Sequence, residues 1–142
     1  MVRPSFVPPP PIRLLRDFTR YRIDLGGVKT AEKQRAEKLL EDAGIKLLVV
    51  ASDIFGVSGR EMMAALIAGE RDPKVLAQLA RSRLRVKMAE LQEAFYGRFD
   101  DHHAFLLARM LARVDAVDAD IADVEGSSRS RVWSGSEAAG LE

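Results

Sequence analysis

SDIFGVSGREMMAALIAGERDPKVLA, residues 52–77, is the stretch that decides the fold, because it encodes the ends of several helices. Ser58 lies three residues before Glu61, which is the spacing of a capping box at the start of a helix. That helix is predicted to end at Gly69. Asp72, followed by a proline, is typical of the start of the next helix. The stretch therefore predicts a compact centre in which sharp turns join three helices.

Longer helices are predicted on both sides of this centre. A helix from residue 12 passes a pair of glycines at 26–27, which cost about 1 kcal/mol each relative to alanine, and ends at Gly44. A run of apolar residues then predicts a short helix over 45–55. A further helix is expected from 73 to about 97. The last helix is predicted from about 100 to 126, with a carboxylate at its start.

The first and last helices carry apolar residues at alternating spacings of three and four. This spacing is typical of a coiled-coil seam, so we expect both seams to pair copies of the chain. The seam residues are Leu14, Phe18, Tyr21, Leu25 and Val28 in the first helix, and Leu107, Leu111, Val114, Ile121 and Val124 in the last.

The chain of 142 residues is 47% hydrophobic and 30% charged, which is ordinary for one globular domain. The sequence predicts an all-α fold with helical hairpins, long coiled-coil-like helices and a three-helix centre. Four consecutive prolines predict a stiff arm at 1–11, the helical domain is expected at 12–126, and a Ser- and Gly-rich tail at 127–142 is predicted to be disordered.

The absence of cysteine excludes disulfide frameworks and thiolate metal sites. No apolar run reaches the length of a membrane span, and no apolar segment of signal-peptide type opens the sequence. We therefore expect a cytoplasmic protein that does not interact with membranes.

Basic residues concentrate near the start of the chain, although Lys and Arg (22) nearly balance Asp and Glu (21) overall. They suit either phosphate contact or the charged flanks of a coiled coil. The turn at 56–59 also faintly resembles the hairpin of helix-hairpin-helix motifs, which offers backbone N–H groups to phosphate. The candidate nucleic-acid contacts are Arg13, Arg16, Arg20, Arg22, Arg81 and Arg85.

Two further groups of residues have side chains that could bind a metal or transfer protons. His102 and His103 follow two aspartates, but adjacent helical residues point about 100° apart, so we expect no shared metal ion. The aspartates between 115 and 123 spread around a helix and predict a solvated acidic face. No nucleophile with a positioned base is recognisable, so we expect no catalytic residue, metal or cofactor in this chain.

Four runs together point to a family: IRLLRDFTRYRIDL, KTAEKQRAEKLLEDAGIKL, ASDIFGVSGREMMAALIAGERDPKVLAQLAR and FDDHHAFLLARMLARVDAVDADIA. They resemble the insertion-sequence-110 family of transposases, recombinases of mobile elements that are guided by a bridge RNA. The resemblance covers about residues 3–124 and is most specific at 52–77.

In that family, a full-length member has an N-terminal domain with four carboxylates that bind magnesium, and a C-terminal domain with a catalytic serine. The resembled region is the helical segment between them, which extends as a coiled coil and brings protomers together. The resemblance places none of the family's catalytic residues on this sequence, and the sequence departs from the family after about 125.

The leading hypothesis is thus a truncated transposase that retains the oligomerisation and linker helices of a DNA recombinase. Its expected partners are further copies of itself or full-length transposase subunits. The alternative is a helical module that binds DNA or structured RNA through residues 13–22 and the turn at 56–59.

Overall fold

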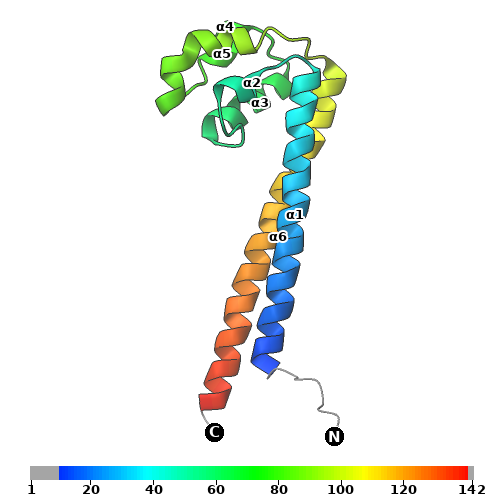
Figure 1. Ribbon diagram of the computed structural model, residues 1–142, viewed down its shortest axis with the longest axis vertical. Helices are drawn as coiled ribbons and strands as arrows, with labels where there is room; N and C mark the ends of the chain where they lie inside the picture. Colours follow the sequence, from blue (N-terminus) through cyan, green and yellow to red (C-terminus); the bar gives the residue numbers. More distant parts are fainter. Residues whose placement is uncertain (1–9, 141–142) are drawn as a thin grey trace, which may run out of the picture. The chain divides into compact units, whose positions relative to one another are not determined.

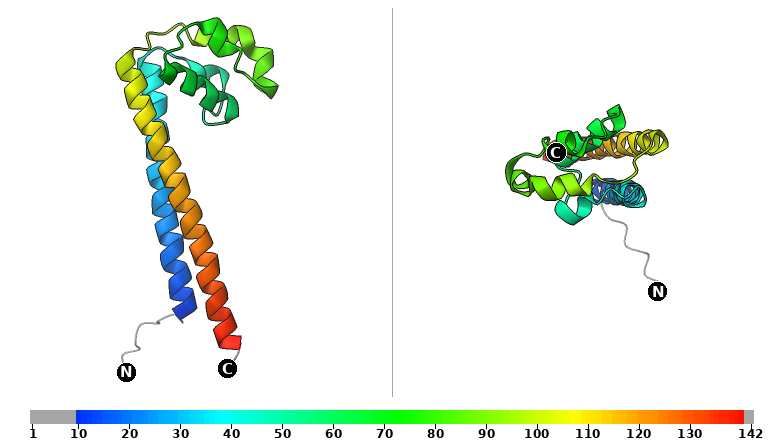
Figure 2. Two further views of the ribbon diagram at one scale, coloured as in Figure 1. Left: turned by 180° about the vertical axis from the view of Figure 1, so that it is seen from behind. Right: turned by 90° about the horizontal axis from the view of Figure 1, so that it is seen from above.

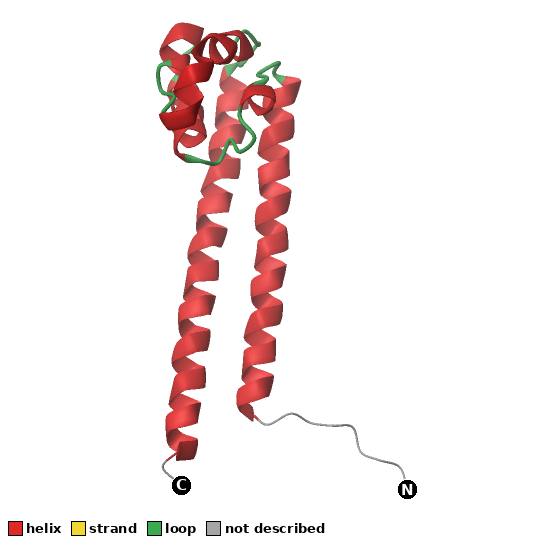
Figure 3. Cartoon of the chain, turned by 60° about the vertical axis from the view of Figure 1, so that its left-hand side comes forward, coloured by secondary structure: helices red, strands yellow, loops and turns green. Residues whose placement is uncertain are grey.

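The computed structural model describes the backbone of residues 10–140 and the side chains of residues 12–131. The predicted all-α fold is confirmed, since the described residues form helices and turns without a strand (Figure 3). The predicted proline-rich arm falls largely on residues 1–9, outside the described residues. None of the described helices is long and apolar enough to cross a membrane.

The helices form two compact units, one of which combines segments from both ends of the sequence. We call residues up to Thr30 together with those from Asp115 the arm, and Ala31–Val114 the central unit. The helices are α1 (Pro10–Asp42), α2 (Leu47–Val50), α3 (Val57–Ala68), α4 (Pro73–Ala77), the 3-10 helix η1 (Ser82–Lys87), α5 (Met88–Ala94) and α6 (Asp101–Gly140).

The arm is a pair of antiparallel helices, in which α1 and α6 lie side by side (Figures 1 and 2). Leu25 of α1 and Val117 of α6 are buried. Arg22 pairs with Glu125, and Lys29 pairs with Asp118, so ion pairs join the two helices at two levels. The arm therefore buries Leu25 of the first predicted seam, and Val117 beside the second, within a single chain.

The central unit holds the hydrophobic core. Ala36 and Leu40 of α1 and Leu107 of α6 are buried in one cluster with residues from the short helices between them. The largest fully buried side chains of this cluster are Leu40, Leu47, Ile54, Met62, Met63, Leu66, Leu76, Leu91 and Leu107.

Several predicted helix ends are confirmed. Gly44 and Gly69 have φ of 79° and 109°, left-handed values that glycine adopts without the strain of a Cβ. At the start of α4, the side chain of Asp72 accepts a hydrogen bond from the N–H of Lys74 at 3.0 Å, as a cap residue should. The predicted helix over 45–55 shrinks to the single turn of α2.

The predicted helix from 73 to about 97 is wrong, because the chain breaks into α4, η1 and α5. The backbone of Ser82 has φ of 52°, which a continuous helix cannot contain. Ala77 and Ala80 are buried on one side of this break and Leu91 on the other. Burial of these residues in the shared core outweighs the local helical pattern.

The last helix was predicted to end near residue 126, but α6 continues to Gly140. The disorder of the tail stays a prediction. The segment contains no proline, so nothing removes a backbone hydrogen bond after residue 126. Its side chains also bond along the helix, since Arg129 Nε donates to the carbonyl oxygen of Glu125 at 3.5 Å.

Candidate functional site

Three arginines form a basic ridge on one side of α1. Arg13, Arg16 and Arg20 are spaced by three and four residues, so they project from one side of the helix. All three side chains are exposed. Among the side chains of residues 12–131, none forms an ion pair or hydrogen bond with them. The ridge therefore presents three cations to solvent.

Arg22 does not belong to this ridge. It lies on the side of α1 that faces α6, where its Nε pairs with Glu125. The sequence grouped Arg22 with the other arginines because periodicity alone did not reveal an acid 103 residues away along the chain.

Arg81 is likewise engaged within the central unit. Its backbone N–H donates to Ser58 Oγ at 2.9 Å, and Nη2 of its side chain lies 2.7 Å from Glu61 Oε1. Arg85 is exposed on η1, a 3-10 helix in which residues three apart, rather than four, lie above one another. The structure therefore separates Arg81 and Arg85, which the sequence placed on successive turns of one α-helix.

The turn at 56–59 differs from the predicted capping box. Gly56 is the N-cap of α3, without a side-chain cap, and Ser58 is buried one residue inside the helix. The carboxylate of Asp53 lines the same shallow groove as Gly56, Ser58 and Arg81. The groove thus holds one acid, Asp53, and one base, Arg81, and the contact of this turn with nucleic acid stays a prediction.

The predicted seam residues divide into two sets. Leu25, Leu107, Leu111 and Val114 are buried, and Leu14, Phe18, Ile121 and Val124 are partly buried. The buried ones serve the chain's own packing instead of the predicted contact with another copy, because two helices of one chain meet at a high effective concentration. Tyr21 and Val28 are 55% and 40% exposed, and their contact with another copy stays a prediction.

A second apolar stripe lies on α1 and was not predicted from the sequence. Ile12, Leu15 and Ile23 are 50%, 47% and 64% exposed and, with Thr19, line one shallow groove on the outside of the helix. We call these four residues the outer stripe. Their spacing of three, four and four is present in the sequence, but the seam at residues 14–28 is the stronger apolar pattern in the same helix.

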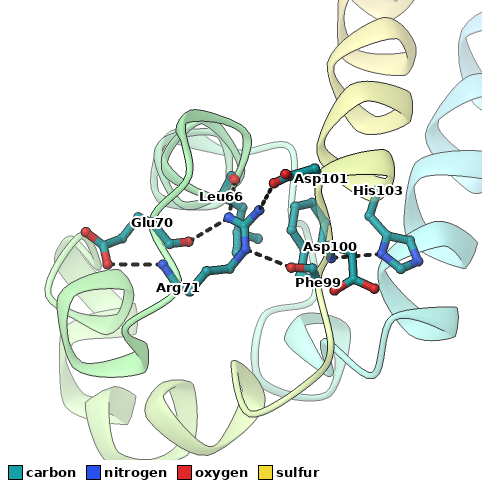
Figure 4. A network of polar contacts seen from close by, with 7 residues as sticks. All are labelled: Leu66, Glu70, Arg71, Phe99, Asp100, Asp101 and His103. Carbon is teal, nitrogen blue, oxygen red and sulfur yellow. Dashed lines mark hydrogen bonds and ion pairs between the residues drawn. The ribbon is translucent and has the colours of Figure 1, made fainter.

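Arg71 joins the end of α3 to the start of α6 within the central unit (Figure 4). Its Nη1 donates to the carbonyl oxygens of Leu66 at 2.6 Å and Glu70 at 3.0 Å, and its Nε to that of Phe99 at 2.7 Å. The guanidinium carbon also lies 4.9 Å from the centre of the Phe99 ring. One side chain therefore satisfies three backbone carbonyls, a role that the sequence did not indicate.

The two histidines lie together at the start of α6. Their ring centres are 3.9 Å apart, and Nδ1 of His103 accepts a hydrogen bond from the backbone N–H of Asp100 at 3.0 Å. This bond is one half of a capping box, with histidine where glutamate is usual. The two rings do not diverge as the 100° helical offset predicts, because the side chains rotate toward each other.

Comparison of the chain with protein-family models, curated proteins and solved structures gave no match.

Proposed function

We propose that the chain is the helical association and linker region of a mobile-element DNA recombinase, and that its arm binds a second copy of the chain. The resemblance to insertion-sequence-110 transposases motivates the recombinase assignment. The observation that carries the association is the outer stripe, an apolar face of α1 that α6 of the same chain leaves exposed.

The outer stripe is suited to contact with another helix. Ile12, Leu15 and Ile23 supply large side chains at the spacing of one helical face. Full burial of such a side chain contributes about 1.5–3 kcal/mol, so the half-exposed residues of the stripe retain a substantial part of that driving force.

Charge and side-chain size favour a second copy as the occupant. The stripe is flanked by Arg16 and Arg20, whereas the outer side of α6 in the arm exposes the acids Asp120 and Asp123. The same side of α6 exposes small residues, Ala116 and Ala119, against which large side chains can pack. Two copies related by a twofold axis would use this pairing twice, as in an isologous dimer.

Ile23→Glu is expected to weaken self-association at least tenfold, because it places a charge in the buried part of the proposed interface. Light scattering coupled to size-exclusion chromatography at tens of micromolar protein measures the effect. Val86→Glu is the matched control, since Val86 is 86% exposed on η1 and lies outside the stripe. A wild-type chain that is folded and strictly monomeric at this concentration would refute the proposal.

The basic ridge of Arg13, Arg16 and Arg20 favours a second candidate function, the binding of DNA or structured RNA. Each arginine that contacts a phosphate of duplex DNA releases about one counterion, so the affinity should fall steeply with salt. The two candidate functions compete, because Arg16 and Arg20 also flank the outer stripe, where they would face the acids of a second copy.

The double variant Arg16→Ala with Arg20→Ala is expected to reduce the slope of log affinity against log salt by about two for duplex DNA. Fluorescence anisotropy across a salt series measures this slope. Lys38→Ala with Lys74→Ala removes the same charge from exposed positions elsewhere and should leave the slope unchanged. Equal effects of the two double variants would show that net charge alone is responsible.

A further inference from the structure

We infer that Asp100, His102 and His103 form a binding site for a divalent transition-metal ion such as Zn²⁺ at the start of α6. Each of the three residues offers one ligand atom, and these atoms lie within 4.8 Å of one another. This is the one such group of three among the residues that the structure describes. Neither the recombinase assignment nor the association of copies depends on this site.

The spacing of the ligand atoms suits coordination after a small adjustment. In a tetrahedral zinc site with bonds near 2.0–2.1 Å, neighbouring ligand atoms lie about 3.3 Å apart. Asp100 and His102 are exposed and His103 is half-buried, so their side chains can rotate inward without moving the core. Three protein ligands would leave a fourth position for water, which is the arrangement of an open zinc site.

The donor set selects the class of metal. Two imidazole nitrogens and one carboxylate oxygen suit Zn²⁺, Cu²⁺ or Ni²⁺, whereas Mg²⁺ prefers oxygen ligands. Asp101 is not a member of this group, and its carboxylate lies 3.7 Å from Nη2 of Arg71. Asp100 is therefore the carboxylate that the ion would take.

The helix dipole opposes a bound cation at this site, whereas nearby carboxylates favour it. The positive end of the helix dipole repels a cation at the start of α6, but the carboxylates of Asp100 and Asp101 at the same place offset that repulsion. These two histidines are the only ones in the sequence, and the sequence contains no cysteine. Any binding through imidazole must therefore involve this pair.

Metal binding would replace the histidine cap of α6. The nitrogen of His103 that accepts the Asp100 N–H is unprotonated, and an unprotonated nitrogen is also what a metal binds. Coordination through Nδ1 displaces this hydrogen bond directly. Coordination through Nε2 moves the ring proton to Nδ1 and abolishes the acceptor. Either way, the freed N–H turns to solvent at an exposed position.

The test is isothermal titration of untagged full-length protein with Zn²⁺ at neutral pH, with Mg²⁺ titrated in parallel. We expect one Zn²⁺ per chain and no binding of Mg²⁺. His102→Gln and His103→Gln should each weaken Zn²⁺ binding tenfold or more. The second variant separates ligand from cap, since glutamine at this position can still accept the Asp100 N–H.

Thermal unfolding gives a second readout. Zn²⁺ should raise the unfolding midpoint of the wild-type chain, because an ion that binds only the folded state stabilises it, and should not raise that of the His102→Gln variant. Glu93→Gln is the control for an exposed carboxylate elsewhere in the central unit and should bind Zn²⁺ as the wild type does. Absence of saturable Zn²⁺ binding, or binding unchanged when both histidines are replaced, would overturn the site.

Discussion

Replacing Gly59 with alanine is expected to lower the free energy of unfolding by about 2 kcal/mol, since overpacking costs about 3 kcal/mol and the helix preference of alanine offsets about 1 kcal/mol of it. A Cβ at this position would lie 2.0 Å from the carbonyl oxygen of Ile54 and 2.5 Å from its carbonyl carbon. Both are backbone atoms, so no side-chain rotation relieves the overlap. The segment before α3 would have to move away from the helix, exposing the fully buried side chain of Ile54.

The opposing effect is smaller. Alanine is favoured over glycine in the interior of a helix by about 1 kcal/mol, and Gly59 lies in α3. The steric term exceeds this gain, so the net change is destabilising. Urea unfolding followed by circular dichroism, at one fixed protein concentration, measures it.

Gly26→Ala is the matched control, because Gly26 lies within α1 and a Cβ there meets nothing within 4 Å. The same substitution should stabilise the chain by about 0.5–1 kcal/mol at this position. The two variants are thus expected to have opposite signs. Stabilisation by both would mean that Ile54 does not approach Gly59 as closely as the structure places it.

Replacing Arg71 with alanine is expected to destabilise the chain by about 2–3 kcal/mol. The guanidinium donates to the carbonyls of Leu66, Glu70 and Phe99, and a hydrogen bond that involves a charged group contributes about 1.5–3 kcal/mol net when it is well buried. The side chain is 34% exposed, so water replaces part of what is lost and the full sum is not reached.

Two variants make this prediction specific to geometry. Lysine at position 71 keeps the charge but lacks the planar fork that reaches carbonyls from two elements, so Arg71→Lys should recover less than half of the loss. Arg98→Ala removes an exposed arginine next to Phe99 in the sequence and should stay within about 0.5 kcal/mol of the wild type. Urea unfolding gives all three values. A neutral Arg71→Ala variant would contradict a linking role for this residue.

The candidate nucleic-acid residues show what helical spacing can predict and what it cannot. The spacing of Arg13, Arg16 and Arg20 was sufficient to predict a shared side of a helix, and the structure leaves them exposed there. Arg22 was grouped with them on sequence proximity, and Arg81 was paired with Arg85 on the spacing of a helix that does not form. Their acids, Glu125 and Glu61, come from elements that only the folded chain brings near.

The same limit applies to the apolar seams. A spacing of three and four indicates that one side of a helix is covered, but it does not identify what covers it. In the arm, Leu25 of α1 and Val117 of α6 are buried within one chain, whereas the outer stripe of α1 is left exposed.

By itself, the sequence determined the helical class, the ends at Gly44 and Gly69, and the start of α4 at Asp72. These features depend on backbone conformation and on hydrogen bonds between residues a few positions apart, and such interactions are encoded locally. Only the tertiary structure decided the partner of Ser58, the break at Ser82 and the pairing of the two imidazoles. Each depends on burial or on the free space around a side chain, which no local pattern of residues specifies.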